Sequence, residues 1–365
     1  MKANYLILSL LMLLLISSCN AYQQVHTRIH KDGSIERELF AFGDSTFMAG
    51  NTNSNPFLFI PDKNWQITRY DSAFVRQLFG KDVKFNAKAT VQSASLETFT
   101  NHAHAKDNLQ PLMLPTETLQ KRFCWFYTYY TYKAVYATVR PQLPVSIDKY
   151  LTEDEQRILL QGNLSAFEGM NGIEQSDELN ELVGKFETWF MHCQFEITIN
   201  AFAELLLETG ETQYAKQLSD VRATLFEQLK DKIDDKDIDS EMVASLLDAH
   251  FRSTFYASFE ASHTKAINDS IDEQSRLLNL FEYALSFSID IPGRLLTANT
   301  PLRYENSPVW KIDAYRFLVQ DYELYAESRT ANVWTFVVTG LLLLIAFISL
   351  YLTIRKNRDD HMVKR

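Results

Sequence analysis

Residues 330–354 read TANVWTFVVTGLLLLIAFISLYLTI, a stretch of 25 residues that contains no charged side chain. As a helix, this stretch would be about 37 Å long, which is enough to cross a hydrocarbon core of about 30 Å with some tilt. Trp334 and Tyr351 lie near its two ends, where amphipathic rings favour the membrane interface. The sequence therefore predicts a transmembrane helix at 330–354, and a core helix of a soluble protein is the alternative.

The residues after this stretch, 355–365, contain five basic side chains and two acidic ones. Basic residues next to a membrane span stay preferentially on the cytoplasmic side. We therefore expect 355–365 to be a cytoplasmic tail of an inner-membrane protein, with the bulk of the chain on the periplasmic side.

The other end of the chain has the layout of a signal peptide. Lys2 precedes residues 6–16, which are apolar except for Ser9 and too few to span a bilayer. The tetrapeptide Ile16-Ser17-Ser18-Cys19 is similar to a lipobox, in which a peptidase cuts before a diacylated cysteine. We therefore expect 1–19 to be a lipoprotein signal and Cys19 the lipidated residue; cleavage after Ala21 is the alternative. With lipid on Cys19, the fold would be held against the membrane at both ends.

Net charge narrows the range of partners. The whole chain carries -10, whereas the tail contributes +3 and Lys2 contributes +1, so the region between them is near -14. Such a surface should repel phosphate backbones and anionic lipid head groups. We therefore expect no nucleic-acid partner; cations and basic protein surfaces remain possible partners.

Residues 20–149 have mostly strand-like patterns. Residues 29–35 place Asp32-Gly33 between two alternating segments, which predicts a β-hairpin. Residues 123–132 read FCWFYTYYTY, almost entirely aromatic and β-favouring. Because aromatics occupy both faces of that segment, we expect one long strand that is central and buried.

Residues 150–279 change to a helical period. Thr152 and Glu155 fit a capping box that starts a helix. Apolar residues at helical spacing predict further helices at 176–207, 212–233, 241–251 and 255–278. We interpret 150–279 as a helical insertion, although a separable helical bundle is the alternative.

Strand patterns return at 280–292, 294–300 and 309–325, within a last segment of 280–329. The simplest topology is a sheet that the N-terminal half begins and these strands complete. The predicted fold class is thus α+β: a β-sheet region interrupted by a helical insertion and followed by one transmembrane helix.

The lipobox, the interrupted β-region, the late residues Pro292-Gly293-Arg294, Asn299 and Trp310, and the terminal anchor together resemble a group of uncharacterised bacterial envelope lipoproteins. The arrangement is also similar to LppM-type envelope proteins. The resemblance covers the whole chain as an arrangement of parts, and it implies no catalytic residues.

Phe42-Gly43-Asp44-Ser45 is similar to the first block of GDSL esterases, in which the serine attacks an ester. Those enzymes also need an Asp-x-x-His pair and a Gly-x-Asn-Asp block, and neither occurs in this chain. We expect a turn at Ser45. An envelope hydrolase that uses Ser45 is the alternative function.

Three patterns could hold a metal. They are Glu260 with His263, His192 with Glu196, and His102 with His104. Di-iron bundles need two Glu-x-x-His copies, and only one is present. We therefore expect no metal and no cofactor.

Cys124 and Cys193 remain after removal of the signal, apart from Cys19. An exported protein permits a disulfide between them. Both lie among aromatic residues, which favours two buried free thiols.

These observations favour a non-enzymatic envelope protein. We expect a membrane-anchored periplasmic binding, sensing or assembly module, with other envelope proteins as its possible partners.

Overall fold

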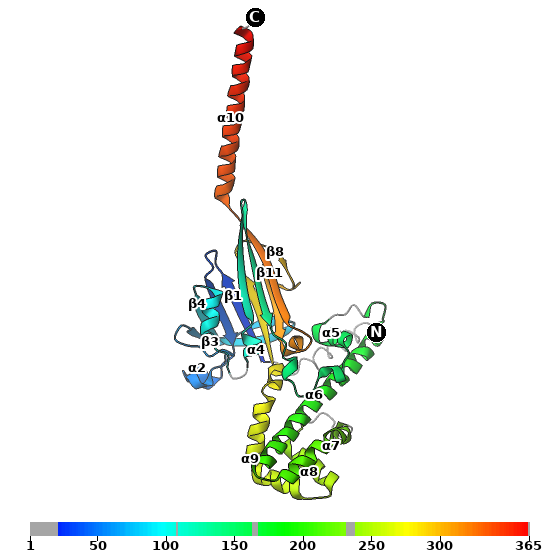
Figure 1. Cartoon of the computed structure of the whole chain (residues 1–365). Coiled ribbons are helices and arrows are strands. Elements are labelled where there is room, and N and C mark those ends of the chain that lie inside the picture. Colours follow the sequence, from blue (N-terminus) through cyan, green and yellow to red (C-terminus); the bar gives the residue numbers. More distant parts are fainter. Residues whose placement is uncertain (1–20, 107–108, 163–166, 231–237, 364–365) are drawn as a thin grey trace.

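The computed structural model of the chain describes residues 21–106, 109–162, 167–230 and 238–363. Over these ranges the molecule has three parts (Figure 1): two β-sheets, a helix that projects from one end of them, and a group of helices at the other end. The predicted α+β class with one C-terminal apolar helix is confirmed. We call the two sheets the head and residues 150–279 the arm. Cys19 lies outside the described residues, as does the rest of 1–19.

The larger sheet of the head has seven strands. In spatial order they are β3 (Gln66–Leu78), β4 (Lys81–Ser93), β2 (Ile35–Ala41), β1 (Ala21–Ile29), β7 (Tyr283–Asp290), β10 (Ser307–Asp313) and β9 (Arg303–Tyr304). The predicted hairpin at 29–35 is confirmed: β1 pairs antiparallel with β2, and Gly33 has a φ of +98° in the turn. The carboxylate of Asp32 accepts from the backbone N–H of Ser34 at 3.0 Å.

The smaller sheet has four strands, in the order β5 (Thr116–Cys124), β6 (Tyr127–Tyr136), β11 (Tyr322–Ala331) and β8 (Arg294–Ala298). The strands after the arm therefore complete two sheets rather than the single sheet that the sequence predicted. β1 pairs in parallel with β7, and β6 pairs antiparallel with β11. The sheets pack face to face, and Tyr132 of β6 stacks on Phe287 of β7 at 6.2 Å between centroids.

The expectation of one long buried strand at 123–132 was wrong. The chain reverses at Trp125 and Phe126, so the segment forms the end of β5, a turn and the start of β6. Tyr130 and Tyr132 are buried between the sheets as expected, whereas Phe123, Trp125 and Phe126 are exposed at the turn. Among the described strands, β6 alone pairs with β5, which makes β5 an edge strand of this sheet.

The predicted strand at 309–325 is also interrupted. Residues Ala314–Leu318 form a short 3-10 helix, η6, between β10 and β11. β10 belongs to the larger sheet and β11 to the smaller one, so the chain crosses between sheets at this point. Phe317 is fully buried there and stacks on Tyr136 at 5.1 Å.

Short helices connect the strands of the head. They are α2 (Ser45–Met48), α3 (Leu96–His102) and α4 (Gln110–Met113), with 3-10 turns at Thr52–Ser54, Arg140–Gln142, Ile147–Lys149 and Leu278–Glu282. The sequence did not predict them, because segments of this length carry no clear helical period.

The arm contains α5 (Glu153–Gln161), α6 (Gly172–Glu208), α7 (Thr212–Lys230), α8 (Ser240–Phe251) and α9 (Phe255–Ser275). The capping box of Thr152 and Glu155 is confirmed. α6 starts earlier than predicted, because Asn171 and Glu174 form a second capping box. α6 also joins two cores: Trp189 and Cys193 pack in the core of the head, whereas Phe195 and Phe202 pack in that of the arm.

β11 ends at Ala331 and α10 (Val333–Val363) begins two residues later, so only Asn332 separates the sheet from the apolar helix. Three hydrogen bonds hold this junction. The backbone N–H of Asn332 donates to the carbonyl of Phe126, its side chain donates to the carbonyl of Trp125, and its amide oxygen accepts from Thr128. The position of α10 relative to the head is therefore set by the β5–β6 hairpin.

β1 runs from the arm end of the head towards the α10 end. Its first residue, Ala21, is opposite Tyr283, which follows directly on the arm. The turn after β1 lies near α10, since the carbonyl of Lys31 accepts from Nζ of Lys121 in β5. β1 covers about 26 Å in this direction, whereas two residues reach at most about 7 Å. We expected a lipid on Cys19 and the helix α10 to hold the head against one membrane from both ends of the chain. The direction of β1 conflicts with this expectation, because β1 starts at the end of the head that is opposite α10.

Candidate functional site

Ser45 is the first residue of α2, and Asp44 is its N-cap. The Asp44 carboxylate accepts from the backbone N–H of Phe47 at 2.8 Å and from the Thr46 hydroxyl at 2.7 Å. These hydrogen bonds lower the pKa of Asp44. The segment that resembles an esterase block thus forms a helix cap. Ser45 is exposed, and no histidine of the described ranges is hydrogen-bonded to it.

The two residues of the Glu-x-x-His pattern bind different groups. The Glu260 carboxylate is buried and accepts from Ser240 at 2.9 Å, whereas Nδ1 of His263 lies 2.9 Å from the carbonyl of Phe259. His263 has non-helical backbone angles, which bend α9 at this point. The pattern therefore does not produce a shared ligand pair.

His192 and Glu196 do lie together, with Nε2 of the histidine 3.5 Å from the carboxylate. Arg222 also pairs with Glu196 at 2.8 Å, and Nδ1 of His192 lies 2.7 Å from the Tyr150 hydroxyl. His104 is exposed, and nothing is described of the His102 side chain. Over the described ranges there is no group of three or more His, Cys, Asp or Glu that could hold a metal ion.

Both described cysteines are free thiols, but only one is buried as expected. Cys193 is fully buried, and burial raises the pKa of its thiol to about 12. Cys124 is exposed at the end of β5, next to the hairpin turn. The expectation that Cys124 would be buried was wrong, because the aromatic segment around it forms a turn.

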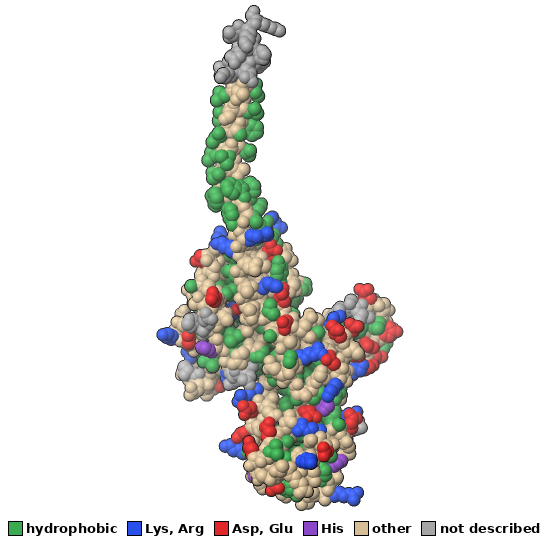
Figure 2. All heavy atoms as spheres, in the orientation of Figure 1, with side chains coloured by type: hydrophobic (Ala, Val, Ile, Leu, Met, Phe, Trp, Pro, Cys, Tyr) green, Lys and Arg blue, Asp and Glu red, His purple; other side chains and the backbone are tan. Residues whose placement is uncertain are grey.

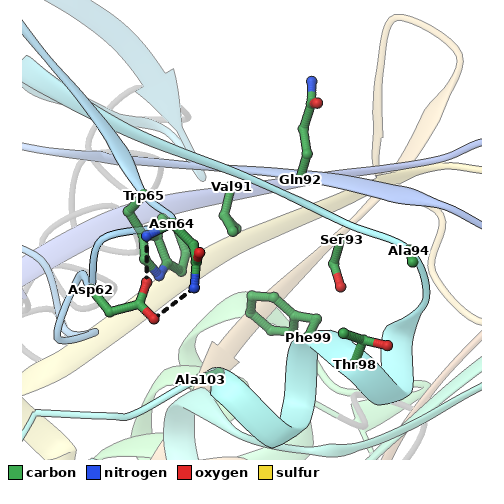
Figure 3. Close-up of a pocket in the computed structure, with 10 residues that line it drawn as sticks. All are labelled: Asp62, Asn64, Trp65, Val91, Gln92, Ser93, Ala94, Thr98, Phe99 and Ala103. Atoms are coloured by element: carbon green, nitrogen blue, oxygen red, sulfur yellow. Dashed lines mark hydrogen bonds between the residues drawn. The ribbon is translucent and has the colours of Figure 1, made fainter.

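The head has a shallow pocket of about 260 Å³ between β4 and α3 (Figure 3). Trp65, Val91 and Phe99 form its apolar part, and the rings of Trp65 and Phe99 meet edge-on at 6.2 Å. Asp62 and Asn64 lie beside Trp65 and hydrogen-bond to each other at 2.8 Å. No pattern in the sequence predicted this pocket, because its lining residues come from separate segments, 62–65, 91–94 and 98–103.

The polar groups around the pocket already have partners in the chain. Gln92 donates to Glu36 at 2.9 Å, Ser93 donates to the Ser95 carbonyl at 3.1 Å, and the Thr98 hydroxyl lies 3.0 Å from that of Ser95. An aromatic ring beside such groups can bind a small polar ligand by contact. None of the pocket residues is placed as an activated nucleophile or a paired acid and base.

The charges of the molecule are divided between its parts. The arm contains 26 acidic and 10 basic residues, a net charge of -16. The segments of the head, 20–149 and 280–329, contain 18 acidic and 20 basic residues, a net charge of +2. All of the net negative charge of residues 20–329 is thus on the arm, which lies opposite α10 (Figure 1).

An exposed apolar pair lies within this acidic surface, at the start of α6. Ile173 is 56% exposed and Met170 is 39% exposed. Glu174, Asp177 and Glu178 lie on the first two turns of α6 and are exposed as well, and Asp177 is one turn beyond Ile173. Figure 2 shows acidic side chains gathered over α5 and this end of α6. The patch of these five residues, which we call the acidic arm patch, combines apolar contact area with negative charge.

No protein-family model, curated protein or solved structure matches this chain.

Proposed function

We propose that this protein is a membrane-anchored, non-enzymatic assembly or binding module of the bacterial cell envelope, and that its acidic arm binds a basic surface of another envelope protein. The observation that carries this proposal is the division of charge, with -16 on the arm and +2 on the head. Opposite charges on two protein surfaces steer their encounter and suppress wrong partners.

The membrane anchor in this proposal is α10. Residues Val333–Ile354 form a helix of 22 residues that is long and apolar enough to cross a membrane. Thr335 in its first turn is buried, whereas the residues from 341 to 354 are all exposed. The basic residues of 355–365 favour a cytoplasmic tail, and the signal-like residues 1–19 favour export of the rest. The head and the arm would then lie in the periplasm, with α10 in the inner membrane.

The arm is suited to hold a partner away from the membrane. α6 has 37 residues and is about 55 Å long. Because its residues pack in the core of the head and in that of the arm, the two parts are joined by a continuous helix. The acidic arm patch lies at the N-terminal end of α6, and Leu182 and Trp189 further along the same helix pack in the core of the head, so the patch is not part of a flexible tether.

Crosslinking in living cells tests this proposal. A photoreactive amino acid at Ile173 should capture a partner, whereas the same probe at Ile60, which is 52% exposed on the head, should not. The Asp177→Asn and Glu178→Gln double variant should weaken the crosslink, because it removes two charges beside the probe. Asp269→Asn with Asp272→Asn is the matched control, since these two exposed residues lie on α9 of the same arm.

Two outcomes would contradict the proposed role of the arm. One is the absence of any captured protein at Ile173. The other is a crosslink that the Asp177 and Glu178 variant and its α9 control weaken equally, because the capture would then not depend on the patch. The orientation is tested separately: protease added to spheroplasts should digest the head and the arm.

A further inference from the structure

The turn of the β5–β6 hairpin contacts the first turns of α10 through aromatic rings. Phe123 stacks on Trp334 at 6.2 Å between ring centroids, and Trp125 meets Trp334 edge-on at 5.7 Å. Phe126 contacts Phe336 at 4.7 Å. These five rings are still 36–56% exposed. We call them the aromatic collar, because they lie where the apolar helix leaves the head.

The collar reaches along α10 into the apolar span. Nε1 of Trp125 donates to Oγ1 of Thr339 at 2.9 Å. Thr339 is six residues beyond Val333, the first residue of the span, which is about 9 Å along a helix. The 22 residues of the span are about 33 Å long, close to a hydrocarbon thickness of about 30 Å. In a bilayer the collar would thus lie at the boundary between headgroups and acyl chains, where tryptophan is favoured.

The hydrogen bond of Trp125 also fits this position. An indole N–H has no acceptor among acyl chains, and an unsatisfied polar group in lipid is unfavourable by several kcal/mol. The hydroxyl of Thr339 supplies the acceptor from within the chain. The hairpin turn is therefore compatible with lipid at both its apolar and its polar atoms.

Three arginines form one cross-strand row near the collar. Arg122 and Arg329 are both paired with Tyr129 of β6, and Arg329 is also paired with Arg294 of β8. Directly paired residues point to the same face of a sheet. Tyr129 is on the half-exposed face of β6, so the arginine row of Arg122, Arg329 and Arg294 lies on the outer face of the head. Figure 2 shows basic side chains at the foot of α10.

The arginine row has no negative partner in the described part of the chain. Arg329 lies over the ring of Tyr127 at 4.4 Å and Arg122 over that of Tyr129 at 5.1 Å, and none of the three forms an ion pair with a described carboxylate. Arg294 and Arg329 are like charges directly opposite each other, which destabilises a sheet. Anions from outside the chain would remove this repulsion.

Backbone packing holds Arg294 in this position. Gly293 has a φ of +92°, and a Cβ there would lie 2.2 Å from the carbonyl oxygen of Arg329. Ser328 donates to the carbonyl of Pro292 at 2.9 Å. Only glycine permits so close an approach of the two strands. The spacing between Arg294 and Arg329 is therefore built into the backbone.

We propose that the arginine row binds the phosphate-bearing headgroups of anionic phospholipids, in the leaflet that the aromatic collar enters. This inference rests on the proposed membrane insertion of α10, but not on the partner of the arm. The division of charge supports it, because an anionic surface attracts the +2 head and repels the -16 arm. Headgroup binding would thus hold the head on the bilayer with the arm pointing away.

The test uses the full-length protein in phosphatidylcholine nanodiscs that contain a small, fixed fraction of a lipid with a dansyl group on its acyl chain. Energy transfer from tryptophan is compared between dansyl-phosphatidylglycerol and dansyl-phosphatidylcholine. We expect the anionic lipid to be preferred, and high salt to reduce the preference. Arg122→Gln and Arg294→Gln should each reduce it by roughly fivefold.

Lys133→Gln is the matched control. It removes one charge from the same face of the sheet, four residues farther from the turn than Tyr129, where Lys133 pairs with Glu323 at 2.7 Å. Equal energy transfer to the two lipids in the wild-type protein would overturn the inference. An equal loss in Lys133→Gln would also overturn it. Protein that does not enter nanodiscs of any composition would instead refute the membrane insertion of α10.

The depth of the collar is measured separately with acyl chains that carry bromine, which quenches nearby tryptophan. Trp125→Phe should reduce the quenchable emission, whereas Trp65→Phe should leave it unchanged, because Trp65 lies in the pocket of the head. Unchanged quenching in Trp125→Phe would show that the collar is outside the bilayer.

Discussion

Glu117→Gln should strongly destabilise the head, because Glu117 is half of a buried ion pair between the two sheets. Nη2 of Arg37 in β2 lies 2.7 Å from Oε1 of Glu117 in β5, and both side chains are 2% exposed. Tyr132 donates to the same carboxylate oxygen at 2.5 Å, and Nε of Arg37 donates to Thr27 at 2.8 Å. Burial opposes the charge of Arg37, but the adjacent Glu117 carboxylate raises the pKa of Arg37 above its ordinary value.

The expected loss of stability in Glu117→Gln depends on the buried charge that the substitution leaves unpaired. Glutamine keeps the volume of the side chain but leaves the Arg37 guanidinium buried without a counter-charge. Breaking one half of a buried pair costs about 3–5 kcal/mol, whereas replacing both halves by apolar residues is often neutral or stabilising. At about 2 °C per kcal/mol for a domain of this size, Tm should fall by about 6–10 °C. The Arg37→Met, Glu117→Leu double variant should recover most of that loss.

Near-ultraviolet circular dichroism of the full-length protein in detergent micelles, recorded on heating, would measure Tm. Glu323→Gln is the surface control, since Glu323 pairs with Lys133 while both are more than 40% exposed. An exposed pair contributes at most about 1 kcal/mol, so this control should lower Tm by about 2 °C or less. A fall in Glu117→Gln no larger than in the control would refute the reasoning, and so would a double variant less stable than the single one.

Three further predictions concern other parts of the head and arm. Gly293→Ala should destabilise the protein by more than about 2 kcal/mol in urea unfolding, whereas Gly80→Ala, which also has positive φ but open space for a Cβ, should cost only about 1–2 kcal/mol. A hydrogen bond from a neighbouring histidine lowers the pKa of Asp290 to about 2, below its unfolded value of about 4. Its carboxylate therefore stabilises the fold above pH ~4, and this contribution is lost as the pH falls through ~2. Asp290→Asn should lower stability by about 1 kcal/mol at neutral pH, discounted for 37% exposure, and this effect should vanish only when the pH is well below ~2 in pH-dependent unfolding. Peptide mapping after N-ethylmaleimide treatment should find Cys124 modified in the folded protein and Cys193 only after unfolding.

Local patterns in the sequence predicted an element correctly where the interactions that form this element lie within a few residues. The turn at Asp32-Gly33 was predicted because glycine supplies the positive φ of that turn. The capping box at Thr152 was predicted because both of its hydrogen bonds lie within four residues. The start of α6 at Asn171 follows the same rule, with Glu174 three residues on, and a search for that spacing would have found it.

The hairpin at Trp125 and Phe126 shows where local patterns failed. A two-residue turn between strands normally requires positive φ and hence glycine or asparagine, but neither residue has a positive φ. Asn332, more than 200 residues away, holds the turn through the carbonyls of both turn residues. Aromatic composition therefore predicted β-structure but gave no signal for where the chain reverses.

The sequence by itself determined the apolar span at the C-terminus, the α+β class and the excess of negative charge, because length, periodicity and charge are properties of the chain. Tertiary structure alone decided that β1 pairs with β7, that the strands divide into two sheets, and that Arg122, Arg294 and Arg329 share one row. Strand register depends on packing between distant segments, and a shift of one residue would move a side chain to the opposite face. The features that carry the two proposals therefore differ in origin: the charges of 150–279 and of the segments on either side are counted along the chain, whereas the arginine row exists only in the folded sheet.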